Sequence, residues 1–189
     1  MSTVRNAKLT PQEYLALERQ AEYKSEYYNG DVFAFAGASK VHNLIVANVI
    51  TILNLQMRGR PCEVYPSDMR VKVSETGLYT YPDVTVVCGK AEVEDEHLDT
   101  LLNPTIIVEV LSPSTEKDDR IVKFAHYRRT PSVKEYILIA QDSVRLEQYV
   151  RQSGGSWLLS EYSDLDVTAK IASVECELPL KDVYDKVIF

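Results

Sequence analysis

Turn and capping signals divide the first part of the chain into a helix and a hairpin. Thr10 and Glu13 form a capping box, with a proline at the first helical position, and predict a helix over residues 10–24. β-prone residues then flank an Asn29-Gly30 pair, which is a strong signal for a two-residue turn. The pattern therefore predicts a helix followed by a hairpin within residues 26–37.

Long apolar runs dominate the middle of the chain. Residues 42–57 predict a long apolar helix. Residues 105–111 and 133–140 are almost continuously apolar, which is typical of strands buried on both faces of a sheet. The segment 115–129 between them has a helical pattern, so this region predicts a parallel, right-handed strand–helix–strand crossover. Further β-prone segments lie at 62–73, 81–89, 144–150 and 157–162.

This order of elements predicts an α/β (or α+β) fold in which helices flank a central mixed sheet. The composition is that of a globular protein, with 45% hydrophobic and 26% charged residues. Because the pattern contains no internal repeat and no low-complexity linker, we expect a single domain over residues 1–189. The acidic stretch 92–99 is expected to be a solvated loop or the start of a helix.

The cysteines and the N-terminal segment bear on the cellular location. Cys62, Cys88 and Cys176 are far apart and lack the spacing of zinc ligands, so we expect free thiols and no zinc site. The chain begins without a stretch typical of a signal peptide, and no apolar run is long enough to span a membrane. These features predict a cytoplasmic protein.

The formal net charge of −7 argues against a constitutive nucleic-acid binder, because neutralising phosphates usually requires a basic surface. A metal site also concentrates carboxylates, however, and bound cations would offset some of that charge. The charge therefore makes a nuclease less expected without excluding one.

Glu109 is the most informative single residue in the sequence. It interrupts an otherwise apolar strand, and strand periodicity places it on the same face as Ile107 and Leu111. A buried carboxylate is costly unless it is paired or binds a metal, which favours a functional role. The alternative is a solvent-facing strand end just before Ser112-Pro113.

Asp83 follows a proline at the start of another apolar strand. Pro-Asp alone is a common turn dipeptide, but here the acid can face Glu109 from a neighbouring strand. Two converging carboxylates suit a hard divalent cation such as Mg²⁺, which can activate water and stabilise charge on a phosphodiester. The helical segment after Glu109 is basic and could contact phosphates, although a solvated helix face explains it equally well. Glu116, Arg120, Lys123 and Tyr127 are expected to share that helix face.

Several motifs in this order resemble the PD-(D/E)XK nuclease superfamily and, more closely, its Uma-type (Uma-two) endonuclease family. The resemblance covers nearly the whole chain, and the strand end around Glu109 is its most specific part. The matching segments are residues 27–31 with the Asn-Gly turn, His42, residues 81–84, residues 108–115, Asp119, Lys123, Tyr127 and residues 133–137.

The resemblance implies a restriction-endonuclease-like core in which Asp83 and Glu109 hold a divalent metal, Mg²⁺ or Mn²⁺. The superfamily pattern places a lysine two residues after the second acid, where this chain has Leu111. In similar proteins the lysine lies on the following helix, which makes Lys123 the candidate. The resemblance also implies that Glu26 assists the metal site.

His42 is a candidate ligand or base, although a histidine at a helix start is as often a structural group. Asp68 is a weaker candidate for the site, and His97 and His126 belong to no constellation.

Two functions remain open from the sequence. The first is metal-dependent hydrolysis of DNA phosphodiester bonds by Asp83, Glu109 and Lys123. The second is a catalytically inactive, dimeric binding or structural module, which the acidic charge and the missing strand lysine favour. Either form is expected to be a homodimer, because symmetric dimers are the commonest soluble oligomers.

Overall fold

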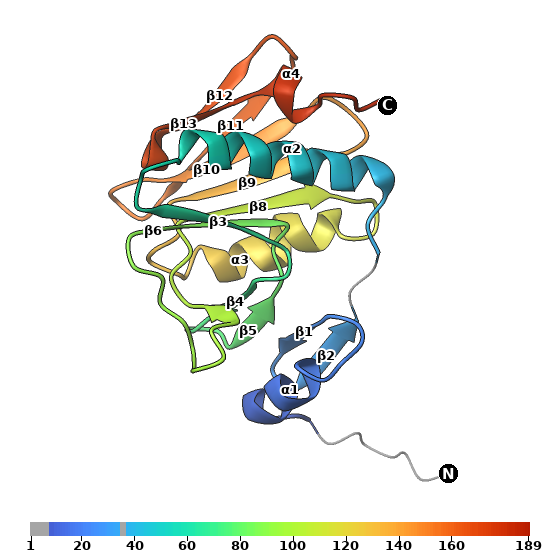
Figure 1. Ribbon diagram of the computed structural model, residues 1–189, viewed down its shortest axis with the longest axis vertical. Coiled ribbons are helices and arrows are strands. Elements are labelled where there is room, and N and C mark those ends of the chain that lie inside the picture. The colour runs from blue at the N-terminus through green and yellow to red at the C-terminus, as the bar shows by residue number, and fades with distance from the viewer. Residues whose placement is uncertain (1–7, 35–36) are drawn as a thin grey trace.

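The computed structural model describes residues 8–34 and 37–189. A six-stranded mixed sheet forms its centre, with the strand order β11-β10-β9-β8-β6-β3 (Figure 1). β8 and β9 are parallel, and the other neighbouring pairs are antiparallel. The strands are β3 (Cys62–Pro66), β6 (Val84–Cys88), β8 (Ile106–Leu111), β9 (Glu135–Ala140), β10 (Leu146–Arg151) and β11 (Trp157–Tyr162).

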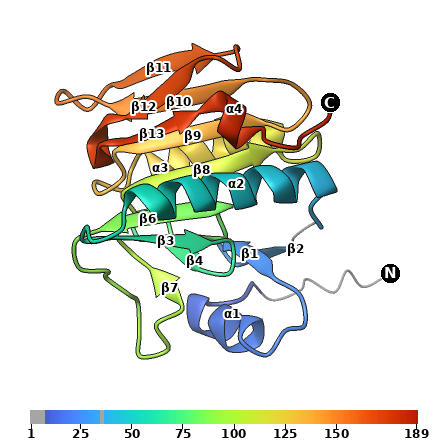
Figure 2. The same ribbon diagram turned by 45° about the horizontal axis from the view of Figure 1, so that its top comes forward.

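Helices cover both faces of this sheet, as the sequence predicts. α2 (Lys40–Gln56) lies on one face, and Figure 2 shows α3 (Phe124–Tyr127) behind the sheet on the other. α2 buries Ile45, Val49 and Leu53 against the sheet. The strands β12 (Thr168–Ile171) and β13 (Cys176–Pro179) and the helix α4 (Leu180–Val183) join the same apolar core, with the 3₁₀ turn η2 (Ala172–Val174) between the two strands.

The alternation of side chains along β8 determines which residues face each helix layer. Ile106, Val108 and Val110 belong to the core under α2, whereas Ile107 and Leu111 belong to the core under α3. Strand geometry therefore directs Glu109 to the α3 side. The predicted parallel crossover from β8 through the helix to β9 is confirmed.

A second sheet carries the N-terminal part of the chain, with the order β2-β1-β5-β4-β7. Its attachment to α1 is aromatic, since Tyr14, Tyr27 and Tyr79 pack with ring centroids 5.0–5.7 Å apart. The elements are α1 (Pro11–Glu18), β1 (Ser25–Tyr28), β2 (Asp31–Ala34), β4 (Arg70–Val73), β5 (Leu78–Thr80) and β7 (Thr100–Leu101).

Charged pairs also fasten α1 to this sheet. Arg19 Nε lies 2.7 Å from Asp99, and its Nη2 lies 2.8 Å from Asp95. Arg70 is buried, pairs with Asp99 at 3.0 Å and donates to the Tyr81 hydroxyl, which in turn donates to Glu18. The acidic stretch 92–99, expected to be a solvated loop, thus supplies two anchors for the N-terminal helix.

Most predicted elements are present, with shifts at their ends. The predicted capping box and Asn29-Gly30 hairpin are confirmed, but the first helix ends at Glu18 rather than near residue 24. It ends there because the Glu18 carboxylate accepts hydrogen bonds from the Ser25 backbone and hydroxyl, which turns the chain into β1. The strands β5, β7, β12 and β13 were not predicted, and two of them, β5 and β7, are only three and two residues long.

The helical segment after β8 begins with a π-helical turn, η1 (Asp118–Lys123), and continues as α3. The predicted common face of this helix is wrong, because the wider π-turn separates its members. Arg120 pairs with Glu116 at 2.8 Å and with Glu147 on β10, whereas Lys123 and Tyr127 face β8.

The prediction of three free thiols is wrong. Cys62 and Cys88 are direct cross-strand partners on β3 and β6 and form a disulfide, while Cys176 is a buried free thiol. Sequence spacing could not reveal the pair, because it depends on the register of two strands. The free-thiol argument for a cytoplasmic location therefore fails. Within residues 8–34 and 37–189, no helix combines the length and the apolar character needed to cross a membrane.

The hairpin turn makes Gly30 a sensitive position. Gly30 has a φ of +89°, and an added Cβ would lie 2.4 Å from the Lys8 Cβ. We expect Gly30→Ala to lower the free energy of unfolding by at least about 1–2 kcal/mol, the usual cost of a left-handed residue. Urea unfolding of both proteins measures the change.

Gly59→Ala is the matched control, because Gly59 has a φ of +75° and nothing within 4 Å of an added Cβ. If Gly30→Ala is no more destabilising than Gly59→Ala, the close contact with Lys8 has no energetic weight.

Candidate functional site

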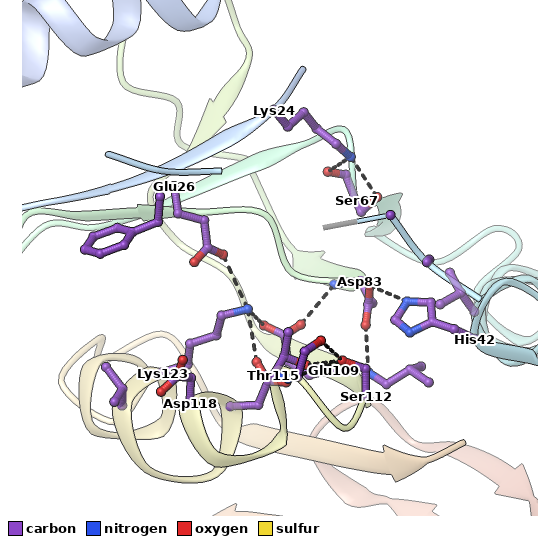
Figure 3. Close-up of a pocket in the computed structure, with 18 of the residues that line it drawn as sticks. Lys24, Glu26, His42, Ser67, Asp83, Glu109, Ser112, Thr115, Asp118 and Lys123 are labelled. Carbon is purple, nitrogen blue, oxygen red and sulfur yellow. Dashed lines mark hydrogen bonds and ion pairs between the residues drawn. The ribbon is translucent and has the colours of Figure 1, made fainter. Parts of the chain in front are cut away.

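Asp83 and Glu109 lie side by side because β6 and β8 are antiparallel neighbours. Val84 is the register partner of Val108, which brings the residue before β6 next to Glu109. The Asp83 backbone N–H faces Glu109 Oε2 at 3.4 Å, and the Val110 N–H donates to Asp83 Oδ2 at 2.7 Å (Figure 3). Both acids are almost fully buried, with exposed fractions of 7% and 3%.

Lys123 joins three carboxylates from different parts of the chain. Its Nζ lies 3.3 Å from Glu109 Oε1, 3.3 Å from Glu26 Oε1 and 3.1 Å from Asp119 Oδ1. Figure 3 shows Glu26 reaching toward Lys123 from the opposite side to Glu109. The ammonium thus stands where the hairpin, the central sheet and the π-helical turn meet.

Asp119 and Lys123 enter the site from the same π-helical turn. They are four residues apart, a spacing that brings side chains to one face of a helix, and Tyr127 follows four residues later. The Tyr127 hydroxyl donates to Glu109 Oε1 at 3.1 Å. π-helical turns occur frequently at functional sites.

His42 reaches Asp83 from the first turn of α2. Its Nε2 lies 2.9 Å from Asp83 Oδ1, and the Ser39 hydroxyl caps the helix by accepting the His42 backbone N–H at 3.0 Å. The Asp83 carboxylate therefore has a partner on each oxygen, His42 on Oδ1 and the Val110 backbone on Oδ2. This arrangement fixes the orientation of the carboxylate.

The site carries more negative than positive charge. Burial raises the pKa of Glu109 well above its ordinary value, Lys123 opposes this shift, and the nearby carboxylates of Asp119, Asp83 and Glu26 reinforce it. Burial likewise raises the pKa of Asp119. Both acids are therefore easier to protonate in the folded protein than in the unfolded chain.

Lys123 remains an ammonium despite its burial. Desolvation lowers the pKa of Lys123, but Glu109, Glu26 and Asp119 outweigh it, and the net shift is upward. A lysine with a raised pKa donates hydrogen bonds and positive charge at neutral pH, and does not act as a base.

These carboxylates converge on Lys123 rather than on a common point for a metal. Within residues 8–34 and 37–189, no group of three or more His, Cys, Asp or Glu side chains is arranged to hold a metal ion. The oxygens of Asp83 and Glu109 are nevertheless the hard ligands that Mg²⁺ and Mn²⁺ prefer. The Lys123 ammonium already lies among three of the four carboxylates, which shows that their oxygens can surround a cation.

A cavity of about 940 Å³ opens over these residues. Asp83, Glu109 and Lys123 form part of its wall, together with residues of the hairpin and of α2. The volume is within the range of sites that bind small molecules or single groups of a larger substrate.

All five predicted site residues, Glu26, His42, Asp83, Glu109 and Lys123, border this one cavity. Their catalytic and metal-binding roles remain predictions.

Asp68, the weaker candidate, lies outside the cluster, where its exposed carboxylate pairs with Lys24 at 3.0 Å. Asp119 matches the family pattern, but no role was predicted for it. Sequence reasoning also missed His126, which borders the cavity and contacts the Thr76 hydroxyl at 2.8 Å.

Comparisons with known proteins agree with the fold and add a family. The sequence model described as "Uma2: Putative restriction endonuclease" matches residues 11–181. An uncharacterized protein of Synechocystis sp. is 36% identical over 159 residues, covering 84% of this chain and 83% of that protein. A second is 40% identical over 153 residues, covering 81% and 86%.

A solved structure has the same fold. The crystal structure of a "putative nuclease" from Anabaena variabilis matches with a TM-score of 0.78 at 20% identity, over 95% of this chain and 99% of that one. The predicted restriction-endonuclease-like architecture, a mixed sheet flanked by helices, is confirmed.

The buried carboxylate of Glu109 predicts a pH-dependent cost to stability. Because the pKa of Glu109 is raised on folding, the unfolded chain loses this proton first as pH rises above about 4. Stability therefore falls as the pH rises from that value to the raised pKa, and the full penalty remains above it. Glu109→Gln removes the penalty and leaves Lys123 paired with Glu26 and Asp119.

We therefore expect Glu109→Gln, in EDTA, to raise the melting temperature at pH 8 and to have little effect at pH 4. The gain should be roughly 2–4 °C for each kcal/mol of this penalty that is removed, measured by calorimetry. Glu147→Gln is the control and should lower the melting temperature, because that buried carboxylate is matched by Arg120 and Arg145. An equal loss in both variants at pH 8 would mean that Lys123 and Glu109 form a net stabilising pair.

Proposed function

Since this chain belongs to the Uma2 family, whose description reads "Putative restriction endonuclease", we propose that it is a divalent-metal-dependent endonuclease that hydrolyses phosphodiester bonds of DNA. Asp83, Glu109 and Lys123 are its central catalytic groups, with Glu26 and His42 in supporting roles. The single observation that carries the proposal is the position of Lys123. It lies on the helix after β8, and its ammonium is 3.3 Å from Glu109, although the strand position two residues after Glu109 holds Leu111.

Asp83 and Glu109 are the residues that would hold the metal, Mg²⁺ or Mn²⁺. Their oxygens are hard donors, and burial, reinforced by the neighbouring carboxylates, raises the pKa of Glu109. When bound, the metal would supply Lewis acidity toward a phosphate oxygen and would promote ionisation of a water molecule.

The residues of the chain would position the reacting groups. The Lys123 ammonium would donate to a phosphate oxygen and stabilise the charge that develops during attack. His42 would act on the reaction through Asp83, by holding the orientation of that carboxylate. Tyr127 would do the same for Glu109.

The reaction consumes one water molecule for each bond cleaved. The water oxygen forms a bond to phosphorus, and one phosphorus–oxygen ester bond breaks. A proton from the water ends on the departing oxygen, which leaves one phosphate monoester and one hydroxyl end.

Nicking of a supercoiled plasmid with Mg²⁺ or Mn²⁺ tests the proposal. We expect Asp83→Asn, Glu109→Gln and Lys123→Met each to reduce the rate by at least about 100-fold, the usual cost of removing a charge that acts in the transition state. Lys117→Met is the matched control, because Lys117 precedes the same π-helical turn but is exposed, and its rate should not change.

Titration calorimetry tests the metal site separately. Wild-type protein should bind Mn²⁺, and Asp83→Ala/Glu109→Ala should not. Equal binding by both proteins, or by neither, would reject the metal assignment. Absence of metal-stimulated nicking at every wild-type concentration would reject the nuclease and favour the second candidate, an inactive binding or structural module that retains the fold.

A homodimer and a cytoplasmic location also stay proposals. The dimer rests on the frequency of symmetric pairs among soluble proteins. Sedimentation of the purified chain over a range of concentrations would measure it.

A further inference from the structure

One face of the N-terminal hairpin forms a wall of the cavity. Residues at alternate positions of β1 share a face, so Glu26 and Tyr28 point the same way, while Tyr27 is buried on the opposite face against Tyr79. Phe33 on β2 is the register partner of Glu26 and therefore lies on the cavity face. Lys24, Glu26, Tyr28 and Phe33 all line the cavity.

Phe33 is an exposed aromatic ring beside the charged site. Its exposed fraction is 53%, and side chains directly opposite each other on antiparallel strands are close neighbours. Its neighbour Glu26 reaches Lys123 at 3.3 Å. The Phe33 ring is therefore next to Glu26, which belongs to the cluster of carboxylates around Lys123. Val122, 48% exposed on the π-helical turn, adds a further apolar surface to the same cavity.

The charges around the cavity do not suit an intact duplex. Duplex binders commonly neutralise about 6–10 phosphates with basic side chains. Here the chain has a net charge of −7, and acids outnumber lysines along the described wall of the cavity. The acidic lining residues are Glu26, Asp83, Glu109, Asp118 and Asp119, and the lysines are Lys24 and Lys123.

The depth of the site leads to the same conclusion. Asp83 and Glu109 are 7% and 3% exposed, so a phosphate must enter the cavity to reach them. In a paired duplex the partner strand and the stacked bases hold each phosphate at the outside of a wide, stiff rod. An unpaired strand can bend, insert a single nucleotide and gain binding energy by stacking its base on an aromatic ring.

We propose that the substrate of this site is an unpaired DNA strand, with one base stacked on Phe33 while the adjacent phosphodiester lies at Asp83 and Glu109. This inference rests on the proposed nuclease function and narrows it to single-stranded or locally unpaired DNA. Affinity comes from the aromatic contact and a few phosphate contacts, which is consistent with an acidic protein.

The test compares three forms of one labelled oligonucleotide in the presence of Mn²⁺: single-stranded, fully paired, and paired with a short mismatched bubble. We expect wild-type kcat/KM to be at least about tenfold higher for the single strand and the bubble than for the duplex. Phe33→Ala should lower kcat/KM on the single strand by about 5- to 150-fold, mainly through KM, because one stacking contact is lost. Phe33→Trp should retain the wild-type rate, and Phe33→Leu should not.

Val32→Ala is the matched control, because Val32 is 45% exposed and lies on the opposite face of the same strand. It should leave the rates unchanged. Circular dichroism of each variant verifies that the fold is intact. Fluorescence anisotropy with Glu109→Gln measures binding of the single strand without cleavage, and adding Phe33→Ala should weaken it by a similar factor.

The two proposals fail in different ways. Equal cleavage of all three substrates, with no effect of Phe33→Ala, would overturn this inference and leave the nuclease intact. Binding that depends on Phe33 without any cleavage would support the strand-binding face and reject the nuclease. Neither binding nor cleavage of any substrate would overturn both.

Discussion

The ion pairs of Lys123 with Glu26, Glu109 and Asp119 join three parts of the fold. The hairpin supplies Glu26, the central sheet supplies Glu109, and the π-helical turn supplies Asp119 and Lys123. A buried ammonium is tolerated only with partners, and so are three buried or half-buried carboxylates. These groups therefore constrain one another: a shift of any one element would leave a charge in a poorly hydrated place without its counterion.

Two charged networks of this protein shift the pKa of their acids in opposite directions. One network holds α1 in place, and the other forms the candidate site. In the network at α1, Arg19 and Arg70 pair with Asp95 and Asp99, and hydrogen bonds from Arg19 hold the pKa of Asp99 below its ordinary value. In the site, carboxylates exceed the available cations, and burial holds the pKa of Glu109 above its ordinary value. The first network stabilises the ionised state that the folded protein adopts. The second network contains more carboxylates than cations, and buried acids with a raised pKa are frequent at functional sites.

The sequence could predict features that have a local cause. Glu109 stands out because one charged residue interrupts an apolar strand, and the Asn29-Gly30 turn and the capping box at Thr10 are each complete within a few residues. Features that depend on register or on irregular backbone could not be predicted. The disulfide between Cys62 and Cys88 requires the alignment of β3 with β6. Asp119 lies on a π-helical turn, an irregular backbone element that the sequence pattern did not predict. Lys123 lies between these cases, since family resemblance suggested it and only the fold gives its distance from Glu109.

The way in which the hairpin is attached has a consequence for how this protein loses activity on heating. The contacts of α1, β1 and β2 with the rest of the chain include aromatic rings, ion pairs, side-chain hydrogen bonds and one register pair between β1 and β5, whereas the central sheet is closed by a large apolar core. Regions with few apolar contacts open at lower free energy than the core does. We therefore expect a temperature range in which the hairpin has separated while the central sheet remains intact. In that range the protein would retain most of its circular dichroism signal, but Glu26 and Phe33 would have left the cavity. The upper working temperature would then depend on the strength of hairpin docking rather than on the melting of the core.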